Sequence, residues 1–203
     1  MMSRSNEGRG PLYRVYINRL RRSLDPDSVP KHVAMMIDGN RRWARQLGFD
    51  SPADGHRAGA AKMREFLEWC DEVGVQVVSL YLLSNDNVTK RDSREIADLI
   101  EIIAELADEL SRYRDWKVQH VGSTAGLPDG LVAVLDAAQE RTKHNPGMHV
   151  NLAVGYGGRR EIVDAVRSII VAYDQEGGSL EELAASLTPE TIGEHLYTGG
   201  QPD

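Results

Sequence analysis

Residues 32–43 read HVAMMIDGNRRW, and this stretch decides the fold that the sequence predicts. Its first part, residues 33–37, is a short continuous apolar run, which predicts a buried strand. Gly39 then allows the backbone to turn tightly. The Asn-Arg-Arg-Trp that comes next lies where the following helix would start. The stretch therefore predicts a strand that ends in a sharp turn into a helix.

The rest of the chain alternates strand-like and helix-like patterns in the same way. Apolar runs of strand length recur at residues 75–83, 116–121 and 148–154. Helical patterns, several with capping residues, lie at residues 51–74, 92–113, 128–142, 159–173, 179–187 and from 188 onward. This alternation predicts an α/β fold with a mainly parallel central sheet that helices cover on both faces.

Composition indicates one soluble globular domain, since 41% of the 203 residues are hydrophobic. The net charge of −7 argues against nucleic acid as a partner. No apolar run approaches the roughly 18–20 residues of a membrane span. The N-terminus has no apolar signal core, so we expect a cytoplasmic protein. Cys70, the single cysteine, cannot form an intramolecular disulfide and is interpreted as a small core residue.

Residues 1–30 are predicted to be a flexible N-terminus with an amphipathic helix, and residues 31–203 to form the domain. Residues 1–10 are polar and rich in glycine. Residues 12–24 place apolar side chains at near-helical spacing with several arginines opposite, which predicts a basic amphipathic helix. Such a helix could contact a membrane surface. Packing on its own domain is the favoured interpretation.

The segments that follow the predicted strands carry the candidate site, because ligands of such sheets bind at the carboxyl ends of the strands. After the first strand, backbone N–H groups at the helix start suit phosphate oxygens, as do Arg41 and Arg42. Asp38 would repel a phosphate, and a carboxylate beside a phosphate site usually indicates a bridging Mg²⁺. The alternative is an ordinary Asp-Gly turn with solvated arginines. The buried strand before the turn and the Asn-Arg-Arg-Trp after it favour the functional interpretation.

Two further segments bring polar groups to the same edge. Residues 84–87 (SNDN) directly follow an apolar strand, although an ordinary capping turn is the alternative. Residues 155–160 (GYGGRR) follow the fourth strand but do not match G-x-G-x-x-G, so a tight turn explains their glycines. Arg159 remains a candidate ligand. His56, in the first turn of its helix, could donate to a phosphate or be a surface or helix-end histidine.

These motifs, in this order, resemble the cis-prenyltransferases, also called undecaprenyl diphosphate synthase-like isoprenyl transferases, from about Lys31 to the end. The anchors are His32-Val33-Ala34, Asp38-Gly39-Asn40 with Arg42-Trp43, Gly55-His56 with Ala58-Gly59-Ala60, Leu80-Tyr81 before Ser84 and Asn87, and Asn151-Leu152-Ala153 before Tyr156-Gly157-Gly158-Arg159. The Asp-rich D-D-x-x-D pairs of the trans-type synthases do not occur in the sequence. So many anchors in one order make the resemblance specific.

The resemblance implies a homodimeric isoprenyl transferase that condenses isopentenyl diphosphate with an allylic diphosphate, geranyl or farnesyl, and forms a cis double bond. Asp38 would act with Mg²⁺ to help the allylic diphosphate leave, since metals and preorganised donors stabilise the developing charge. Asn87 stands where the family removes a proton from isopentenyl diphosphate; because an amide is a weak base, a diphosphate oxygen is the alternative acceptor. The implied substrate-binding residues are Gly39, Asn40, Arg41, Arg42, Trp43, His56, Ser84, Asn85, Asp86, Val88, Lys90, Arg91 and Arg159.

The chain departs from the family pattern around the second site segment. Asp86 replaces the usual glutamate, and Val88 replaces a common aromatic residue. The family arginine soon after is either Lys90 or Arg91. An arginine that is common just before His56 is missing. These differences predict a subclass with altered substrate preference.

Leu82 lies where long-chain members often have a small residue, on a strand that lines the elongation tunnel. A bulky side chain there would block growth, so we expect a short product such as a cis-farnesyl diphosphate. A long-chain polyprenyl diphosphate synthase is the alternative. A non-catalytic subunit is disfavoured because silent partners lose the aspartate and its basic followers. A Rossmann-type nucleotide binder is disfavoured because a single glycine follows the first strand.

The chain stops at Asp203. Full-length family members continue with a strand, an Arg-x-Ser-Gly-Glu-type segment that holds isopentenyl diphosphate, and a further acid that binds Mg²⁺. We therefore expect a C-terminally truncated domain with a nearly complete allylic site, and poor turnover by the chain alone. Robust synthesis by the purified 203-residue chain would contradict this expectation.

Overall fold

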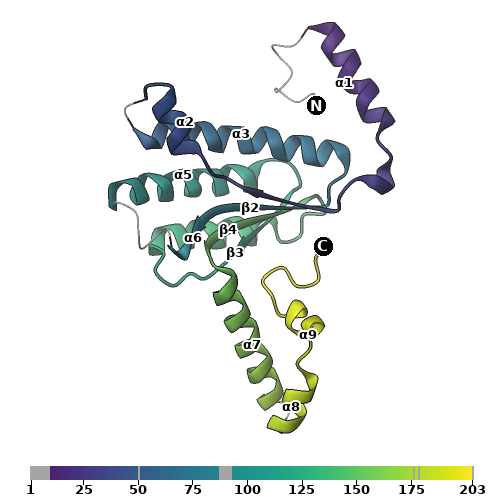
Figure 1. The fold of residues 1–203 in the computed structure, drawn as a ribbon, viewed down its shortest axis with the longest axis vertical. Helices are drawn as coiled ribbons and strands as arrows, with labels where there is room; N and C mark the ends of the chain where they lie inside the picture. The colour runs from purple at the N-terminus through teal and green to yellow at the C-terminus, as the bar shows by residue number, and fades with distance from the viewer. Residues whose placement is uncertain (1–9, 50, 87–92, 176, 178, 203) are drawn as a thin grey trace.

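A four-stranded parallel sheet forms the centre of the molecule (Figure 1). The structure is a computed structural model that describes residues 10–49, 51–86, 93–175, 177 and 179–202. The strands are β1 (His32–Met36), β2 (Val77–Ser84), β3 (Lys117–Val121) and β4 (His149–Tyr156), in the spatial order β1-β2-β4-β3. All three pairings are parallel, so the predicted parallel α/β fold is confirmed.

Helices connect the strands in the predicted order, with ends that shift by a few residues. They are α1 (Pro11–Ser23), α2 (Asn40–Gln46), α3 (Pro52–Val73), α5 (Ser93–Arg112), α6 (Asp129–Thr142), α7 (Gly158–Gln175), α8 (Leu180–Ser186) and α9 (Pro189–Glu194), with a short 3-10 helix, η2 (Pro26–Ser28), that the sequence did not predict. The Ser51 hydroxyl accepts a hydrogen bond from the Ala53 N–H at the start of α3, and Gly74 ends the helix with φ of 90°. These two features confirm the predicted limits of that helix.

One face of the sheet is apolar and packs against α3, α5 and α6 (Figure 1). Side chains alternate between the two faces along a strand. Val78 and Leu80 of β2 therefore share a face, and they lie opposite Val150 and Leu152 of β4 in the strand register. All four are fully buried in the core. Burying each such side chain contributes about 1.5–3 kcal/mol, so this face supplies the main hydrophobic stabilisation.

The second face of the sheet carries polar side chains, which corrects the expectation of helices packed on both faces. Ser79, Asn151 and Gln119 align across β2, β4 and β3. The Asn151 amide donates to Ser79 Oγ (3.1 Å), and Gln201 hydrogen-bonds both Asn151 and Gln119. A helix would bury few apolar groups on such a row. Residues 197–202 lie against it instead.

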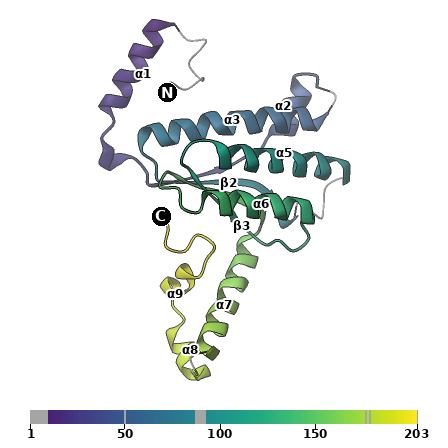
Figure 2. The ribbon, with the colours of Figure 1, turned by 180° about the vertical axis from the view of Figure 1, so that it is seen from behind.

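The chain after β4 forms an arm below the sheet. α7 runs away from the carboxyl end of β4, and α8 and α9 return beside it (Figures 1 and 2). Glu161, buried in the first turn of α7, accepts hydrogen bonds from the Tyr156 hydroxyl (2.8 Å) and the Tyr197 N–H (3.0 Å). Burial and this carboxylate raise the pKa of Tyr156. Glu161 thus ties the returning chain to the end of β4.

α1 projects from the body, so the favoured expectation that it packs on its own domain is wrong. Figures 1 and 2 show it beyond the end of α3, away from the sheet. Leu12, Val15 and Tyr16 are 84%, 66% and 57% exposed, and Arg21 forms an ion pair with Glu72 of α3. Among the described residues, no helix combines the length and apolarity that a membrane crossing needs. The helix is amphipathic as predicted, but the part of the chain that the structure describes leaves its apolar side exposed.

The burial of Cys70 predicts low thiol reactivity. The side chain lies in the core, as the sequence predicted, and burial raises its pKa to about 11. Because the thiolate is the reactive form, native protein at pH 8 should react with iodoacetamide about a hundredfold more slowly than protein unfolded in urea. Mass spectrometry of timed samples measures both rates. Equal rates in the two states would contradict the core position.

Candidate functional site

The carboxyl ends of β1, β2 and β4 lie at one edge of the sheet, and the three predicted site segments follow them. β1 pairs with β2, and β2 with β4, in parallel. Ser84 at the end of β2 lies opposite Tyr156 at the end of β4. Asp38 comes two residues after the last residue of β1. The structure therefore brings the segments to a common edge, as the sequence predicted.

The turn after β1 is shaped by Gly39 and Asp38. Gly39 has φ of 90°, a conformation that L side chains rarely adopt, and directly precedes α2. Its N–H donates to Asp38 Oδ1 at 2.6 Å, which holds the exposed carboxylate over the turn. The first N–H groups of a helix have no partner within the helix, and Arg41 and Arg42 are exposed beside them. The turn can thus offer N–H donors, guanidinium groups and a carboxylate to one ligand.

Two glycines of α3 let this turn lie directly on the helix. A Cβ at Gly55 would be 2.3 Å from the Asn40 backbone oxygen, and a Cβ at Gly59 would be 2.7 Å from Asn40 Nδ2. The two glycines are four residues apart, so they share one face of α3. A larger residue at Gly55 would push Asn40, and with it the Asp38 turn, away from α3. The close approach of α2 to α3 therefore sets where the candidate anion site lies.

His56 and Glu95 lie together beside this contact. His56 is in the second turn of α3 and only 7% exposed, so the alternative of a surface or helix-end histidine is wrong. Its Nε2 lies 3.5 Å from Glu95 Oε1 on α5. Arg41 Nε lies 3.7 Å from the same oxygen. One carboxylate, 15% exposed, therefore faces two of the predicted diphosphate ligands.

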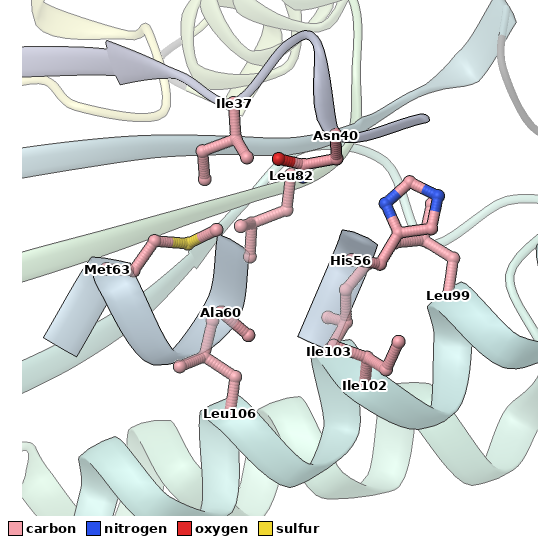
Figure 3. Close-up of a pocket in the computed structure, with 10 residues that line it drawn as sticks. All are labelled: Ile37, Asn40, His56, Ala60, Met63, Leu82, Leu99, Ile102, Ile103 and Leu106. Atoms are coloured by element: carbon pink, nitrogen blue, oxygen red, sulfur yellow. The ribbon is translucent and has the colours of Figure 1, made fainter. Parts of the chain in front are cut away.

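A small apolar cavity adjoins Asn40 and His56 (Figure 3). Leu82 of β2 extends into it from the sheet side. The remaining wall residues come from the end of β1 and from α3 and α5; they are Ile37, Ala60, Met63, Leu99, Ile102, Ile103 and Leu106. The cavity volume is about 40 Å³, which is room for a few water molecules. The chain-length role of Leu82 stays a prediction, and its place in this wall is compatible with that role.

Asn85 joins the segment after β2 to the turn after β4. A Cβ at Gly155 would lie 3.5 Å from Asn85 Oδ1, and one at Gly157 would lie 3.5 Å from Asn85 Nδ2. Gly155 also has φ of 65°, and its Cβ would come within 2.3 Å of the Ser123 carbonyl oxygen. The positive φ and the close packing at the end of β4 therefore explain Gly155 without a bound nucleotide.

The other predicted site residues lie at the surface or outside the described residues. Trp43 is exposed and stacks on Phe49 with ring centroids 5.6 Å apart, and Arg159 is exposed at the start of α7. Ser84 is half-buried and Asp86 exposed. Asn87, Val88, Lys90 and Arg91 lie outside the described residues. The sequence analysis missed Glu95, because an acid in the first turn of a helix is ordinary and nothing local indicates that Arg41 and His56 face it.

A magnesium site made of protein groups alone is not found in the described part of the chain. No group of three or more His, Cys, Asp or Glu side chains there could hold a metal ion. Mg²⁺ is, however, often held by one or two carboxylates together with substrate phosphates. Asp38, an exposed carboxylate at the same turn as Arg41 and Arg42, fits this second mode.

The chain is similar to known proteins in its sequence and in its fold. Residues 36–203 match a family model described as "Putative undecaprenyl diphosphate synthase". The chain is 51% identical over 193 residues to (2Z,6E)-farnesyl diphosphate synthase of Thermobifida fusca, covering 95% of this chain and 75% of that protein. It is 46% identical over 196 residues to the protein of the same name from Mycobacterium tuberculosis, covering 95% and 74%. A crystal structure of lavandulyl diphosphate synthase from Lavandula x intermedia in complex with dimethylallyl diphosphate has a TM-score of 0.75 at 29% identity, covering 85% of this chain and 72% of that one.

Gly55→Ala should displace the Asp38 turn, because the new Cβ would meet the Asn40 backbone oxygen and a backbone cannot move aside like a side chain. We expect the free energy of unfolding to fall by about 1–3 kcal/mol, as at other overpacked sites. Inorganic diphosphate should bind about tenfold more weakly, which corresponds to roughly 1.4 kcal/mol. Urea unfolding and calorimetry measure the two effects.

Gly130→Ala on α6 is the matched control for that variant. Gly130 is also helical, but nothing lies within 4 Å of its Cβ position. The substitution should raise the free energy of unfolding by roughly 0.5–1 kcal/mol and leave diphosphate binding unchanged. Similar effects of the two substitutions would contradict the role of the contact between α2 and α3.

Glu95→Gln should tighten the binding of inorganic diphosphate, because the carboxylate competes with the ligand for Arg41 and His56. A partly exposed ion pair contributes up to about 1 kcal/mol, so the Kd should fall about fivefold in titration calorimetry. Glu101→Gln removes the same charge further along α5, where Glu101 faces Arg57 at 3.8 Å, and should change nothing. Weaker binding by Glu95→Gln would show that the carboxylate positions the ligands rather than competing for them.

Proposed function

The chain belongs to the cis-prenyltransferase family, and we propose that it condenses isopentenyl diphosphate with an allylic diphosphate, geranyl or farnesyl, into a short cis-prenyl diphosphate. One observation carries the proposal: the Asp38 turn, with its arginines, adjoins an apolar cavity across Asn40. A prenyl diphosphate has the same division into an anionic head and an apolar chain. The relatives named (2Z,6E)-farnesyl diphosphate synthase support the short product.

The Asp38 turn would hold the allylic diphosphate. Backbone N–H groups of the first turn of α2, the guanidinium groups of Arg41 and Arg42, and His56 would surround its oxygens. As the allylic C–O bond ionises, negative charge grows on the diphosphate, and donors that the fold already holds in place stabilise it. The isopentenyl double bond then attacks the allylic carbon, and loss of a proton forms the new double bond. Asn87, at the family's position, or a diphosphate oxygen would accept that proton.

We propose that Asp38 binds Mg²⁺ jointly with the diphosphate. Family members generally use this ion. When bound, it supplies charge that neutralises the departing diphosphate. The hydrogen bond from Gly39 would keep the carboxylate turned to the ligand as charge develops. Arg41 and Arg42 would also neutralise part of the charge on the departing diphosphate.

The allylic chain would extend from the turn into the cavity between β2, α3 and α5. At about 40 Å³ the cavity is smaller than a prenyl chain, and we propose that α3 and α5 separate as the chain enters. Leu82 would limit growth from the sheet side. The remaining proposed substrate contacts are Trp43, Ser84, Asn85, Asp86, Val88, Lys90, Arg91 and Arg159.

We also propose that the chain works in the cytoplasm as a homodimer whose contact with membranes is peripheral. Ile162, Val163 and Ile170 are exposed near one another along α7. A second subunit would remove such apolar surface from water. Peripheral contact suits substrates and products that carry both a charged head and an apolar chain.

Condensation is the direct test of the proposed function. Full-length protein is incubated with labelled isopentenyl diphosphate and geranyl or farnesyl diphosphate, and the products are sized by chromatography. Asp38→Asn should lower kcat by about 10²–10³-fold, the loss seen when a charge-stabilising group is removed, and EDTA should also suppress turnover. Asp136→Asn, an exposed position on α6, is the charge-matched control and should keep full activity. Turnover that neither EDTA nor Asp38→Asn diminishes would rule out the assigned role.

Leu82→Ala separates a short-chain from a long-chain synthase. Removing the side chain enlarges the cavity on its sheet side, so the products should lengthen by one or more isoprene units. Leu180→Ala, an exposed position on α8, should leave product length unchanged. Mass spectrometry of dephosphorylated products measures chain length. Identical product lengths in wild type and Leu82→Ala would remove Leu82 as the determinant.

A further inference from the structure

An apolar stripe runs along the outer side of α1. Leu12, Tyr16 and Leu20 recur every four residues, so they lie above one another on one side of the helix. All three are exposed, and the exposed Tyr13 and Val15 widen the stripe. A continuous apolar surface of this kind marks an interaction site more often than an isolated exposed leucine does.

The polar side of α1 faces the body of the molecule. Arg21 forms its ion pair with Glu72 at the end of α3. Leu12 and Arg21 are nine positions apart, which is two and a half turns at 3.6 residues per turn, so they lie on opposite sides of the helix. The contact with α3 therefore turns the apolar stripe outward, and both views of the ribbon show α1 standing clear of the sheet (Figures 1 and 2).

The charge of α1 is opposite to that of the whole chain. The helix contains Arg14, Arg19, Arg21 and Arg22, and residues 8–24 include no acidic residue, whereas the net charge of the chain is −7. An occupant that complements α1 must be anionic and must also accept apolar side chains. The surface of a membrane with anionic lipids meets both requirements. Tyr13 and Tyr16 suit it further, because tyrosine favours the boundary between apolar and aqueous layers.

We propose that α1 docks the protein on anionic membranes, with Leu12, Tyr16 and Leu20 inserted among the acyl chains and with Arg19 and Arg22, which lie on the stripe side of the helix, at the headgroup phosphates. The inference rests on the proposed function, because a prenyl diphosphate partitions into the boundary between headgroups and acyl chains. An enzyme docked at this boundary releases its product directly into the membrane. The peripheral contact with membranes then depends on α1 and on anionic lipids.

Vesicle flotation tests the docking. Purified protein is mixed with phosphatidylcholine vesicles, with or without phosphatidylglycerol, at low and high salt. Wild type should float with the anionic vesicles at low salt and much less with neutral ones. Tyr16→Glu and Leu20→Glu should each lower partitioning about tenfold, and Arg19→Gln should lower it about fivefold. Leu180→Glu, at an 81% exposed position on α8, is the matched control and should float like wild type.

Two results would overturn the proposal. The first is equal flotation of wild type and Leu20→Glu. The second is a Tyr16→Glu variant that still floats but has half the wild-type mass in sedimentation, which would mean that a second copy of the chain covers the stripe. Condensation is assayed on the same variants without vesicles. Failure of the docking would therefore leave the proposed reaction intact, and failure of the reaction would leave the flotation result intact.

Discussion

The close approach of α2 to α3 is the contact on which the rest of the site depends. Asn40 lies against Gly55 with its carbonyl oxygen and against Gly59 with its side chain, at distances that leave no space for a Cβ. The same helix, α3, carries His56 and much of the cavity wall. An anion-binding turn and an apolar cavity are therefore held in one fixed relation. The two glycines matter for function although they offer no chemistry to a substrate.

Arg41 and Glu95 form a polar cluster with His56, which lines the apolar cavity. Arg41 and His56 converge on one Glu95 oxygen, at 3.7 Å and 3.5 Å. Glu95 belongs to the first turn of α5, and the following turns of α5 supply Leu99, Ile102 and other cavity walls. A diphosphate that displaces the carboxylate would loosen the start of α5, one of the two helices that we propose separate when a prenyl chain enters. Binding of the head and opening for the chain would then be coupled through one side chain.

The two faces of the sheet have different structural roles. The apolar face builds the core with α3, α5 and α6, while the polar row on the other face receives the returning chain. Glu161 ties that returning chain to the end of β4, next to the turn that contacts Asn85. α1 is attached differently, through Arg21 and Glu72, so it can present an apolar side to another surface.

The sequence by itself determined the order and kind of the helices and strands, the parallel sheet, the Asp38 turn, the core position of Cys70 and the amphipathic character of α1. These depend on periodicity, capping and turn chemistry, which are properties of neighbouring residues. Only the tertiary structure decided that helices pack on one face of the sheet, that the stripe of α1 faces outward, that His56 is buried, and that Glu95 faces Arg41 and His56. Each of these depends on segments far apart in the chain. The sequence shows the polar residues of β2, β3 and β4. Their alignment in one row across the sheet depends on the strand register, which packing sets.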